Sequence, residues 1–147
     1  MKIKKAVIPV AGKGTRFLPA TKQIPKEMIP ILGVPMIYYV VEEAVKSGIE
    51  TVVLVTSTGK EAIENFFDRN LELEAFLESK GKTRELELVR NIGTMIDVVS
   101  VRQKEQLGLG HAVLSAKPII GDDPFAVLLG DDLIFGGPAV TKQLIDV

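Results

Sequence analysis

The sequence contains no cysteine, and aromatic residues make up only 5% of its 147 residues. Without cysteine there are no disulfides, zinc–thiolate sites or cysteine nucleophiles, and a reducing compartment is compatible, so we expect a cytoplasmic protein. The sequence also lacks the run of about 20 apolar residues that a membrane helix needs. The apolar run 6–11 contains Pro9 and leads straight into a basic, glycine-rich stretch, which argues against a secretory signal.

Neither sign of charge is in excess. Eighteen basic residues face nineteen acidic ones, for a net charge of −1, so nothing electrostatic favours nucleic-acid binding. Hydrophobic residues (46%) and charged residues (25%) are close to globular averages. We therefore expect one globular domain, in which any bound anion is held by local geometry.

Apolar runs alternate with amphipathic stretches along the chain. The expected strands are 6–10, 51–56, 96–101 and 125–129. A first helix is expected to begin near Pro35 and to end at Gly48. Two helices separated at Gly81 are expected in 60–91, and a short helix is expected in 110–117. This alternation predicts a Rossmann-like α/β fold with a mostly parallel sheet flanked by helices. Segment 138–147 starts like a helix without a terminator, so we expect a truncated chain.

A glycine-rich loop follows the first expected strand, in residues 10–30 (VAGKGTRFLPATKQIPKEMIP). Gly12 and Gly14 allow a sharp turn and a close approach of the backbone to an anion. Arg16 and Lys26 add positive charge, and backbone N–H groups with an arginine suit a triphosphate. The loop therefore predicts nucleotide chemistry.

Two common nucleotide motifs do not fit this loop. The dinucleotide fingerprint needs a third glycine where Phe17 stands, and the Walker loop needs Gly-Lys-Ser/Thr, whereas Gly14 follows Lys13.

The glycine-rich loop, segment 103–110 and Asp131 all follow expected strands. In a parallel sheet they would meet at the carboxyl edge, where ligands bind.

The segments AGKGTRFLPAT and KQIPKEMIP resemble the signature of bacterial UTP:glucose-1-phosphate uridylyltransferases (UDP-glucose pyrophosphorylases). MIYYVVEEAVKSGI and VRQKEQLGLGHAVLSAKPIIGDDPFAVLLGDD continue the resemblance in the same order. The resemblance implies a Mg²⁺-dependent transferase of nucleotide-sugar biosynthesis that converts UTP and glucose 1-phosphate into UDP-glucose and pyrophosphate. Family members are roughly twice as long. Residues 1–147 would thus be the nucleotide-binding part, without the sugar-binding half, of a protein that is a homo-oligomer at full length.

The resemblance also assigns roles to charged residues. Arg16 would grip the β and γ phosphates, and Lys26 would stabilise the charge that develops at the α-phosphorus. Asp131, at the end of a buried strand, would hold Mg²⁺ together with phosphate oxygens.

Further residues would hold the nucleotide. By resemblance Gln103 reads the pyrimidine edge, with Gln106 as the rival amide, and Gly108 lets the base lie against the backbone. The remaining nucleotide-binding residues are Ala11, Gly12, Gly14 and Thr15.

Other residues are given ordinary roles. We expect Lys13 to be solvated and Asp132 to act as a cap. We expect His111 to be structural, because transfer to an already ionised sugar phosphate needs no general base. An apolar stripe (Leu73, Phe76 and Leu77) predicts either a partner surface or a satellite packing cluster.

Two alternative functions stay open. Thymidylyl- and adenylyltransferases share the Gly-x-Gly-Thr-Arg loop, although they usually carry Gly-Gly where this chain has Ala11 and Gly12. The second alternative is a nucleotide-binding module without turnover. In either case we expect the chain by itself to be inactive or weakly active.

Overall fold

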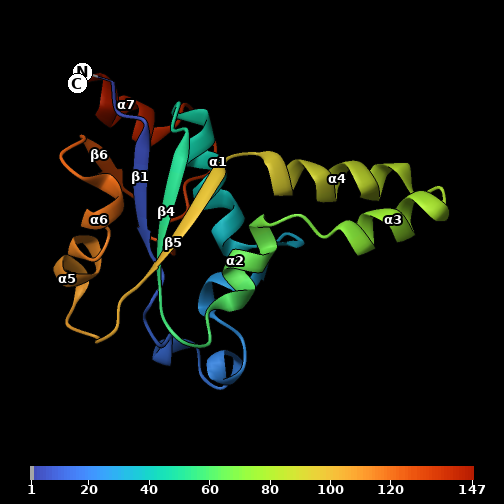
Figure 1. Ribbon diagram of the computed structural model, residues 1–147, viewed down its shortest axis with the longest axis horizontal. Helices are drawn as coiled ribbons and strands as arrows, with labels where there is room; N and C mark the ends of the chain where they lie inside the picture. The colour runs from blue at the N-terminus through green and yellow to red at the C-terminus, as the bar shows by residue number, and fades with distance from the viewer. Residues whose placement is uncertain (1) are drawn as a thin grey trace.

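A four-stranded parallel sheet with the strand order β5-β4-β1-β6 forms the centre of the protein (Figure 1). The computed structural model describes residues 2–147. The strands are β1 (Lys5–Pro9), β4 (Thr51–Thr56), β5 (Asp97–Arg102) and β6 (Phe125–Val127). The predicted parallel α/β architecture is confirmed.

Helices cover both faces of this sheet, and Figure 1 shows the two layers. One layer holds α1 (Met36–Lys46) and α2 (Glu61–Phe67), and the other holds α5 (Leu109–Leu114) and α6 (Lys117–Ile120). A last helix, α7 (Val140–Asp146), contacts α1. No helix within residues 2–147 is long and apolar enough to cross a membrane.

The core has two halves because successive side chains of a strand point to opposite faces. Ile8 and Leu54 pack with α1 and α2 on one face, whereas Val7 and Val53 pack with α5 and α6 on the other. All four side chains are fully buried. Burial on both faces explains why these strands are continuous apolar runs.

The first helix follows its predicted boundaries closely. It begins directly after Pro35, and Gly48 lies beyond its end with φ 83°, where its N–H donates to the carbonyl oxygen of Val45. A residue without a Cβ is favoured in this left-handed conformation. The predicted glycine stop is confirmed.

The prediction of two helices in 60–91 is wrong, because the structure has three. After α2 come α3 (Leu71–Ser79) and α4 (Thr83–Thr94). The break at Gly81 is confirmed, but a second break lies where Asp68 is extended and the side chain of Asn70 accepts a hydrogen bond from the N–H of Leu73. Asparagine is a strong N-cap, so it starts a new helix. The pair α3–α4 projects from the body as an arm (Figure 1).

Four smaller predictions also need correction. The strand expected at 125–129 ends at Val127, where its pairing with β1 ends, and the helix expected at 110–117 is divided into α5 and α6. The expected strand 96–101 lies one residue later. Asp132 caps no helix, because the backbone there forms a turn in which its N–H donates to the carbonyl oxygen of Leu129.

The glycine-rich loop has little regular structure. It contains the short 3-10 turns Thr15–Phe17, Ala20–Lys22 and Lys26–Met28. A two-stranded antiparallel ribbon, β2 (Pro30–Ile31) and β3 (Val34–Pro35), then leads into α1. The loop therefore leaves β1 and returns to the body before the first long helix.

Candidate active site

A cavity of about 290 Å³ lies at the carboxyl ends of β1 and β6. From β1 the chain passes outward to β4 and β5, and then returns to the other side of β1 as β6. Such a reversal of strand order opens a crevice, which is the usual ligand site of open α/β sheets. We call this cavity the switch-point cleft.

Six of the nine predicted site residues line the switch-point cleft, although they come from three separate stretches of the sequence. They are Ala11, Gly12, Lys26, Gln103, Gly108 and Asp131. The prediction that the glycine-rich loop, segment 103–110 and Asp131 meet at one edge of the sheet is confirmed.

A lysine and a carboxylate lie together in this cleft. The Nζ of Lys26 is 3.2 Å from the Oδ2 of Asp131, and both side chains are partly exposed. A partly exposed ion pair contributes little to stability, so a competing anion or cation can separate the two groups at small cost.

Gly14 brings the glycine-rich loop against Lys26. Its φ is 64°, and a Cβ at this position would be 3.2 Å from both the Cβ of Lys26 and the Cγ2 of Thr21. The hydroxyl of Thr21 donates to the carbonyl oxygen of Gly14 at 2.7 Å. Both the left-handed backbone and the close packing therefore favour glycine.

Thr15 and Arg16 lie outside the cleft. Both belong to the exposed 3-10 turn that follows Gly14, and neither lines the switch-point cleft. Of the predicted site residues, Gly14, Thr15 and Arg16 are thus the three that the cavity does not include. Their proposed contacts with a nucleotide stay predictions.

Gln103 is buried and has a fixed orientation. Its Nε2 donates to the carbonyl oxygen of Gly108 at 3.2 Å and lies 3.0 Å from the Nδ1 of His111. When Nδ1 accepts this bond, both amide hydrogens are used and the Oε1 of Gln103 stays available as an acceptor. Gly108, with φ 95°, precedes α5 in a conformation that other residues rarely adopt.

The rival amide and the only histidine have structural contacts. Gln106 donates from Nε2 to the carbonyl oxygen of Ala11 at 3.0 Å, and this bond ties the 103–110 segment to the glycine-rich loop. His111 lies in the first turn of α5 and orients Gln103, in agreement with the structural role expected for it.

Sequence reasoning missed a buried ion pair below the cleft. The Nζ of Lys60 is 3.0 Å from the Oε2 of Glu27, and both side chains are almost fully buried. The other oxygen, Oε1, is buried without a hydrogen-bond partner within residues 2–147. A Cβ on Gly130 would be 3.3 Å from the Cγ of Glu27. No local pattern in the sequence marks this pair, because the two residues are 33 positions apart.

One shifted pKa lies beside the site. The N–H groups of Glu61 and Gly59 lower the pKa of the Glu61 carboxyl, and the nearby Arg102 lowers this pKa further. The ionised carboxylate lies 3.2 Å from the guanidinium of Arg102, which also donates to the hydroxyl of Thr58. Arg102 is thus held at the end of β5.

Asp131 is the one carboxylate among the described residues that line the switch-point cleft. Within residues 2–147, no group of three or more His, Cys, Asp or Glu side chains is arranged to hold a metal. Mg²⁺ is commonly bound by one or two carboxylates together with substrate phosphates. The exposed carboxylate of Asp131 fits such a site when phosphates occupy the cleft.

The parallel sheet with helices on both faces and the cleft at its strand reversal define a Rossmann-like α/β protein. The sequence model of the nucleotidyl transferase family matches residues 5–146. The chain belongs to this family.

Named relatives agree with this assignment. The chain is 57% identical over 145 residues to UTP–glucose-1-phosphate uridylyltransferase 2 of Staphylococcus saprophyticus, covering 99% of the chain and 50% of the relative. It is 58% identical over 146 residues to UTP–glucose-1-phosphate uridylyltransferase of Staphylococcus epidermidis, covering 99% and 51%. The chain therefore spans about half the length of these curated relatives.

Solved structures show the same fold. A UTP-bound UGPase from Acinetobacter baumannii superposes with a TM-score of 0.94 at 53% identity, covering 99% of this chain and 52% of that chain. A UDP-glucose pyrophosphorylase complexed with UDP-glucose gives a TM-score of 0.83 at 44% identity, with 99% and 53% covered.

Proposed function

We propose that the chain is the nucleotide-binding part of an enzyme that transfers a uridylyl group from UTP to glucose 1-phosphate. The names of its relatives support this reaction. The observation that carries the proposal is that Lys26, Asp131 and Gln103 line one cleft at the strand reversal. The cleft thereby combines a cation, a carboxylate and an oriented amide.

Gln103 would select the base. With both Nε2 hydrogens used by Gly108 and His111, its Oε1 accepts a hydrogen bond from the ligand. Uracil carries a donor at N3, whereas cytosine carries an acceptor there, so the buried amide favours uracil. Thymine has the same N3 donor, and a thymidylyltransferase is therefore the second candidate.

Lys26 would act on the phosphates. A phosphate oxygen of glucose 1-phosphate forms a bond to the α-phosphorus of UTP, while the bond from that phosphorus to pyrophosphate breaks. The extra negative charge at the α-phosphate is stabilised by the ammonium group of Lys26, which leaves Asp131 for this contact. Arg16 would approach the β and γ phosphates from the exposed turn.

Asp131 would hold Mg²⁺ once Lys26 has moved to the phosphates. When bound, the metal ion neutralises phosphate charge and orients the leaving pyrophosphate. The carboxylate of Asp131 has two roles in this proposal. It pairs with Lys26 when no nucleotide is bound, and it binds the Mg²⁺ ion when the nucleotide is bound.

Calorimetric titrations of the 147-residue protein with UTP, dTTP, CTP and ATP, each with Mg²⁺, test the proposal. We expect weak binding that is strongest for UTP; stronger binding of dTTP would favour the second candidate, and equal binding of all four would contradict both. A pyrophosphate-release assay with glucose 1-phosphate checks turnover. We expect little or none from this chain alone, and activity equal to that of a relative of full length would contradict this expectation.

Two substitutions separate the roles of the charged residues. Lys26→Met should weaken UTP binding about tenfold or more with or without Mg²⁺, because a charged hydrogen bond is lost. Asp131→Asn should remove the effect of Mg²⁺ but preserve metal-free binding, since Lys26 is then unpaired. Lys82→Met, an exposed lysine next to the turn of the arm, is the matched control. An Asp131→Asn protein that responds normally to Mg²⁺ would exclude Asp131 as the ligand.

A further inference from the structure

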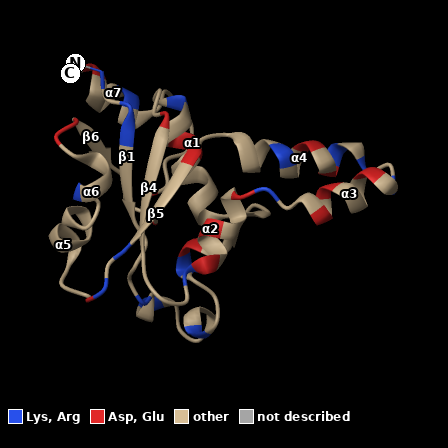
Figure 2. Cartoon of the chain, in the orientation of Figure 1, with Lys and Arg blue, Asp and Glu red and all other residues tan. Residues whose placement is uncertain are grey.

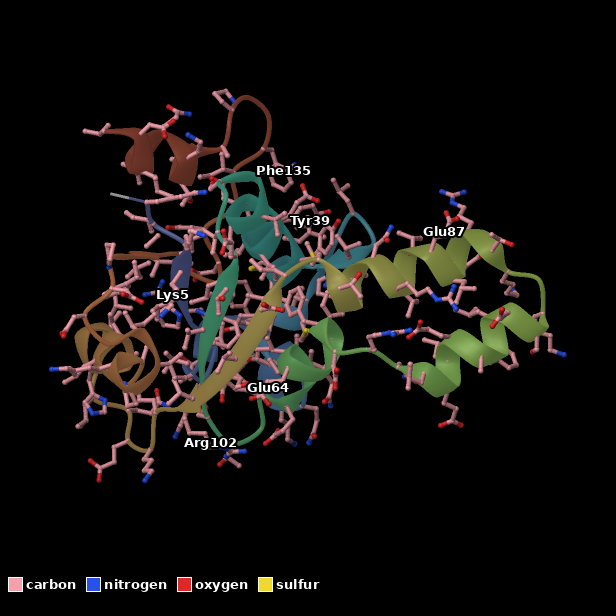
Figure 3. All side chains as sticks on the ribbon, turned by 45° about the horizontal axis from the view of Figure 1, so that its top comes forward. Lys5, Tyr39, Glu64, Glu87, Arg102 and Phe135 are labelled. Carbon is pink, nitrogen blue, oxygen red and sulfur yellow. The ribbon has the colours of Figure 1, made fainter. Side chains whose placement is uncertain are left out.

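A second and larger cavity, of about 690 Å³, lies beside the switch-point cleft at the carboxyl ends of β4 and β5. Its walls are residues 11–13 and 21–25 of the glycine-rich loop, the loop 57–60 after β4, and residues 102–104 and 106 after β5. We call it the lysine cleft. Figure 2 shows basic segments in the loops at this end of the sheet, and Figure 3 shows Arg102 at the end of β5.

The charge of the lysine cleft is one-sided. Its lining includes five basic residues and no carboxylate: Lys13, Lys22, Lys60, Arg102 and Lys104. The whole chain, in contrast, has a net charge of −1. A concave surface lined by charge of one sign concentrates ions of the opposite sign.

Two of these five charges are compensated and three are available. Lys60 is paired with the buried Glu27, and Arg102 is paired with Glu61. Lys13, Lys22 and Lys104 are exposed, and none of them forms an ion pair within residues 2–147. The cleft therefore has about three free ammonium groups.

Three of the neutral donors around the cleft already have acceptors. The hydroxyl of Ser57 donates to the carbonyl oxygen of Ala11, and the N–H of Gly59 donates to Glu61. The hydroxyl of Thr21 donates to Gly14. The free ammonium groups act as mobile point charges and favour a ligand with several closely spaced negative charges.

The two clefts share one wall, made of Ala11, Gly12, Gln103 and Gln106, and differ in the rest of their lining. Lys26, Gly108 and Asp131 line the switch-point cleft alone, whereas Lys22 and Lys104 line the lysine cleft alone. Between them lies the hydrogen bond from Gln106 to Ala11. The ammonium groups of Lys22 and Lys104 are therefore not used in the proposed uridylyl transfer, although Ala11, Gly12 and Gln103 border both clefts.

We propose that the lysine cleft is a second anion site that binds an oligophosphate, meaning two or more linked phosphate groups, independently of the nucleotide. The volume exceeds that needed for a single phosphate, and three free ammonium groups match the charge of a pyrophosphate group. The oligophosphate is either a free ion or part of a second phosphorylated molecule. Both sources present two or more linked phosphate groups to the lysine cleft. The inference goes beyond the proposed function.

The test is a calorimetric titration of the protein with inorganic pyrophosphate, at low salt and without Mg²⁺, before and after saturation with UTP. We expect pyrophosphate to bind in both cases. Lys22→Gln and Lys104→Gln should each weaken it about 2- to 5-fold, which is the range for an exposed ion pair, and should leave UTP affinity unchanged. Raising the salt should weaken pyrophosphate binding. Lys82→Gln is the matched control.

Loss of pyrophosphate binding after saturation with UTP would overturn the proposal, as would an equal weakening of UTP binding in both lysine variants. Either result would mean that the cleft receives the phosphates of the nucleotide itself. If UTP does not bind at all, the proposed function is wrong. The lysine variants still test the pyrophosphate site in that case, because their effect on pyrophosphate binding is measured without UTP. Titration with ADP after saturation with UTP separates the two sources, since tighter binding than that of pyrophosphate indicates a second phosphorylated molecule.

Discussion

Glu27, below the switch-point cleft, and Glu74, in the arm, are both almost completely buried glutamates with different partners. The side chain of Glu27 is 1% exposed and pairs with Lys60, which is itself only 8% exposed. Glu74 is 4% exposed and pairs with Arg69 and Arg90, which are 47% and 46% exposed. In the body both charges are removed from water, whereas in the arm only the carboxylate is.

This difference separates an element that positions a site from one that holds a projecting helix pair. A buried ion pair pays the desolvation of both groups, so it gives little net stability, but losing one partner is costly. Lys60 borders the lysine cleft, and Glu27 directly follows Lys26 in the glycine-rich loop. The bond between Lys60 and Glu27 therefore joins the loop after β4 to the glycine-rich loop. In the arm, Arg69 binds Glu74 through both Nε and Nη2, and Arg90 adds a third bond. The arm keeps two of these three bonds when Arg90 is lost.

The largest expected effect comes from removing one partner of each pair. Lys60→Met leaves Glu27 buried without a cation and should lower the free energy of unfolding by about 3–5 kcal/mol. Arg90→Met should have a clearly smaller effect, because Arg69 still compensates Glu74. Urea denaturation followed by circular dichroism measures both. Equal losses would show that the two glutamates depend on their partners to the same degree.

A control shows whether the cost comes from the unpaired charge. The double substitution of Glu27→Gln with Lys60→Met removes both charges and should recover part of the lost stability. If the double variant is as unstable as Lys60→Met, packing of the lysine stem, rather than charge, explains the loss.

Apolar side chains allow the same comparison between body and arm. Leu54 is fully buried in β4, whereas Leu88 is more than half exposed in α4. Leu54→Ala should lower the free energy of unfolding by about 2–5 kcal/mol, and Leu88→Ala should change it by no more than about 0.5 kcal/mol. Figure 3 shows the neighbouring Glu87 far from the sheet. A large loss in Leu88→Ala would mean that the arm is covered in solution.

The body was also easier to predict from the sequence than the arm. Continuous apolar runs located β1 and β4 to within a residue, because both faces of these central strands are buried. In the arm, Leu77 is buried while Leu73 and Phe76 are exposed, so the predicted stripe is only partly a packing cluster. The break before α3 depends on Asn70 acting as a cap, which helical periodicity does not reveal.

The same limit applies to the site. Residues next to strand ends, such as Gly12 and Asp131, could be placed at the cleft because parallel strands end at one edge. The contacts between distant side chains could not be predicted, since they depend on how the loops pack. The pair of Glu27 and Lys60 and the bond from Gln106 to Ala11 are of this kind.

The smallest expected effect concerns pH and affects the arm. The hydrogen bonds from Arg69, followed by those from Arg90, lower the pKa of Glu74 below its ordinary value of 4.5. A carboxylate whose pKa is lower in the folded state stabilises that state above pH 4.5, and this contribution is lost as the pH falls through the lowered pKa. The protection of the amide hydrogens of α3 and α4 against exchange, relative to the intrinsic exchange rate at each pH, should therefore decrease in this acid range more than the protection of β1 and β4. Glu74→Gln should exchange faster at neutral pH and lose most of this acid dependence, because its side chain does not titrate. If the variant keeps the wild-type pH profile, a group other than Glu74 controls the acid response of the arm. The pairing of Glu74 with exposed arginines would then not explain the difference in acid response between the arm and the body.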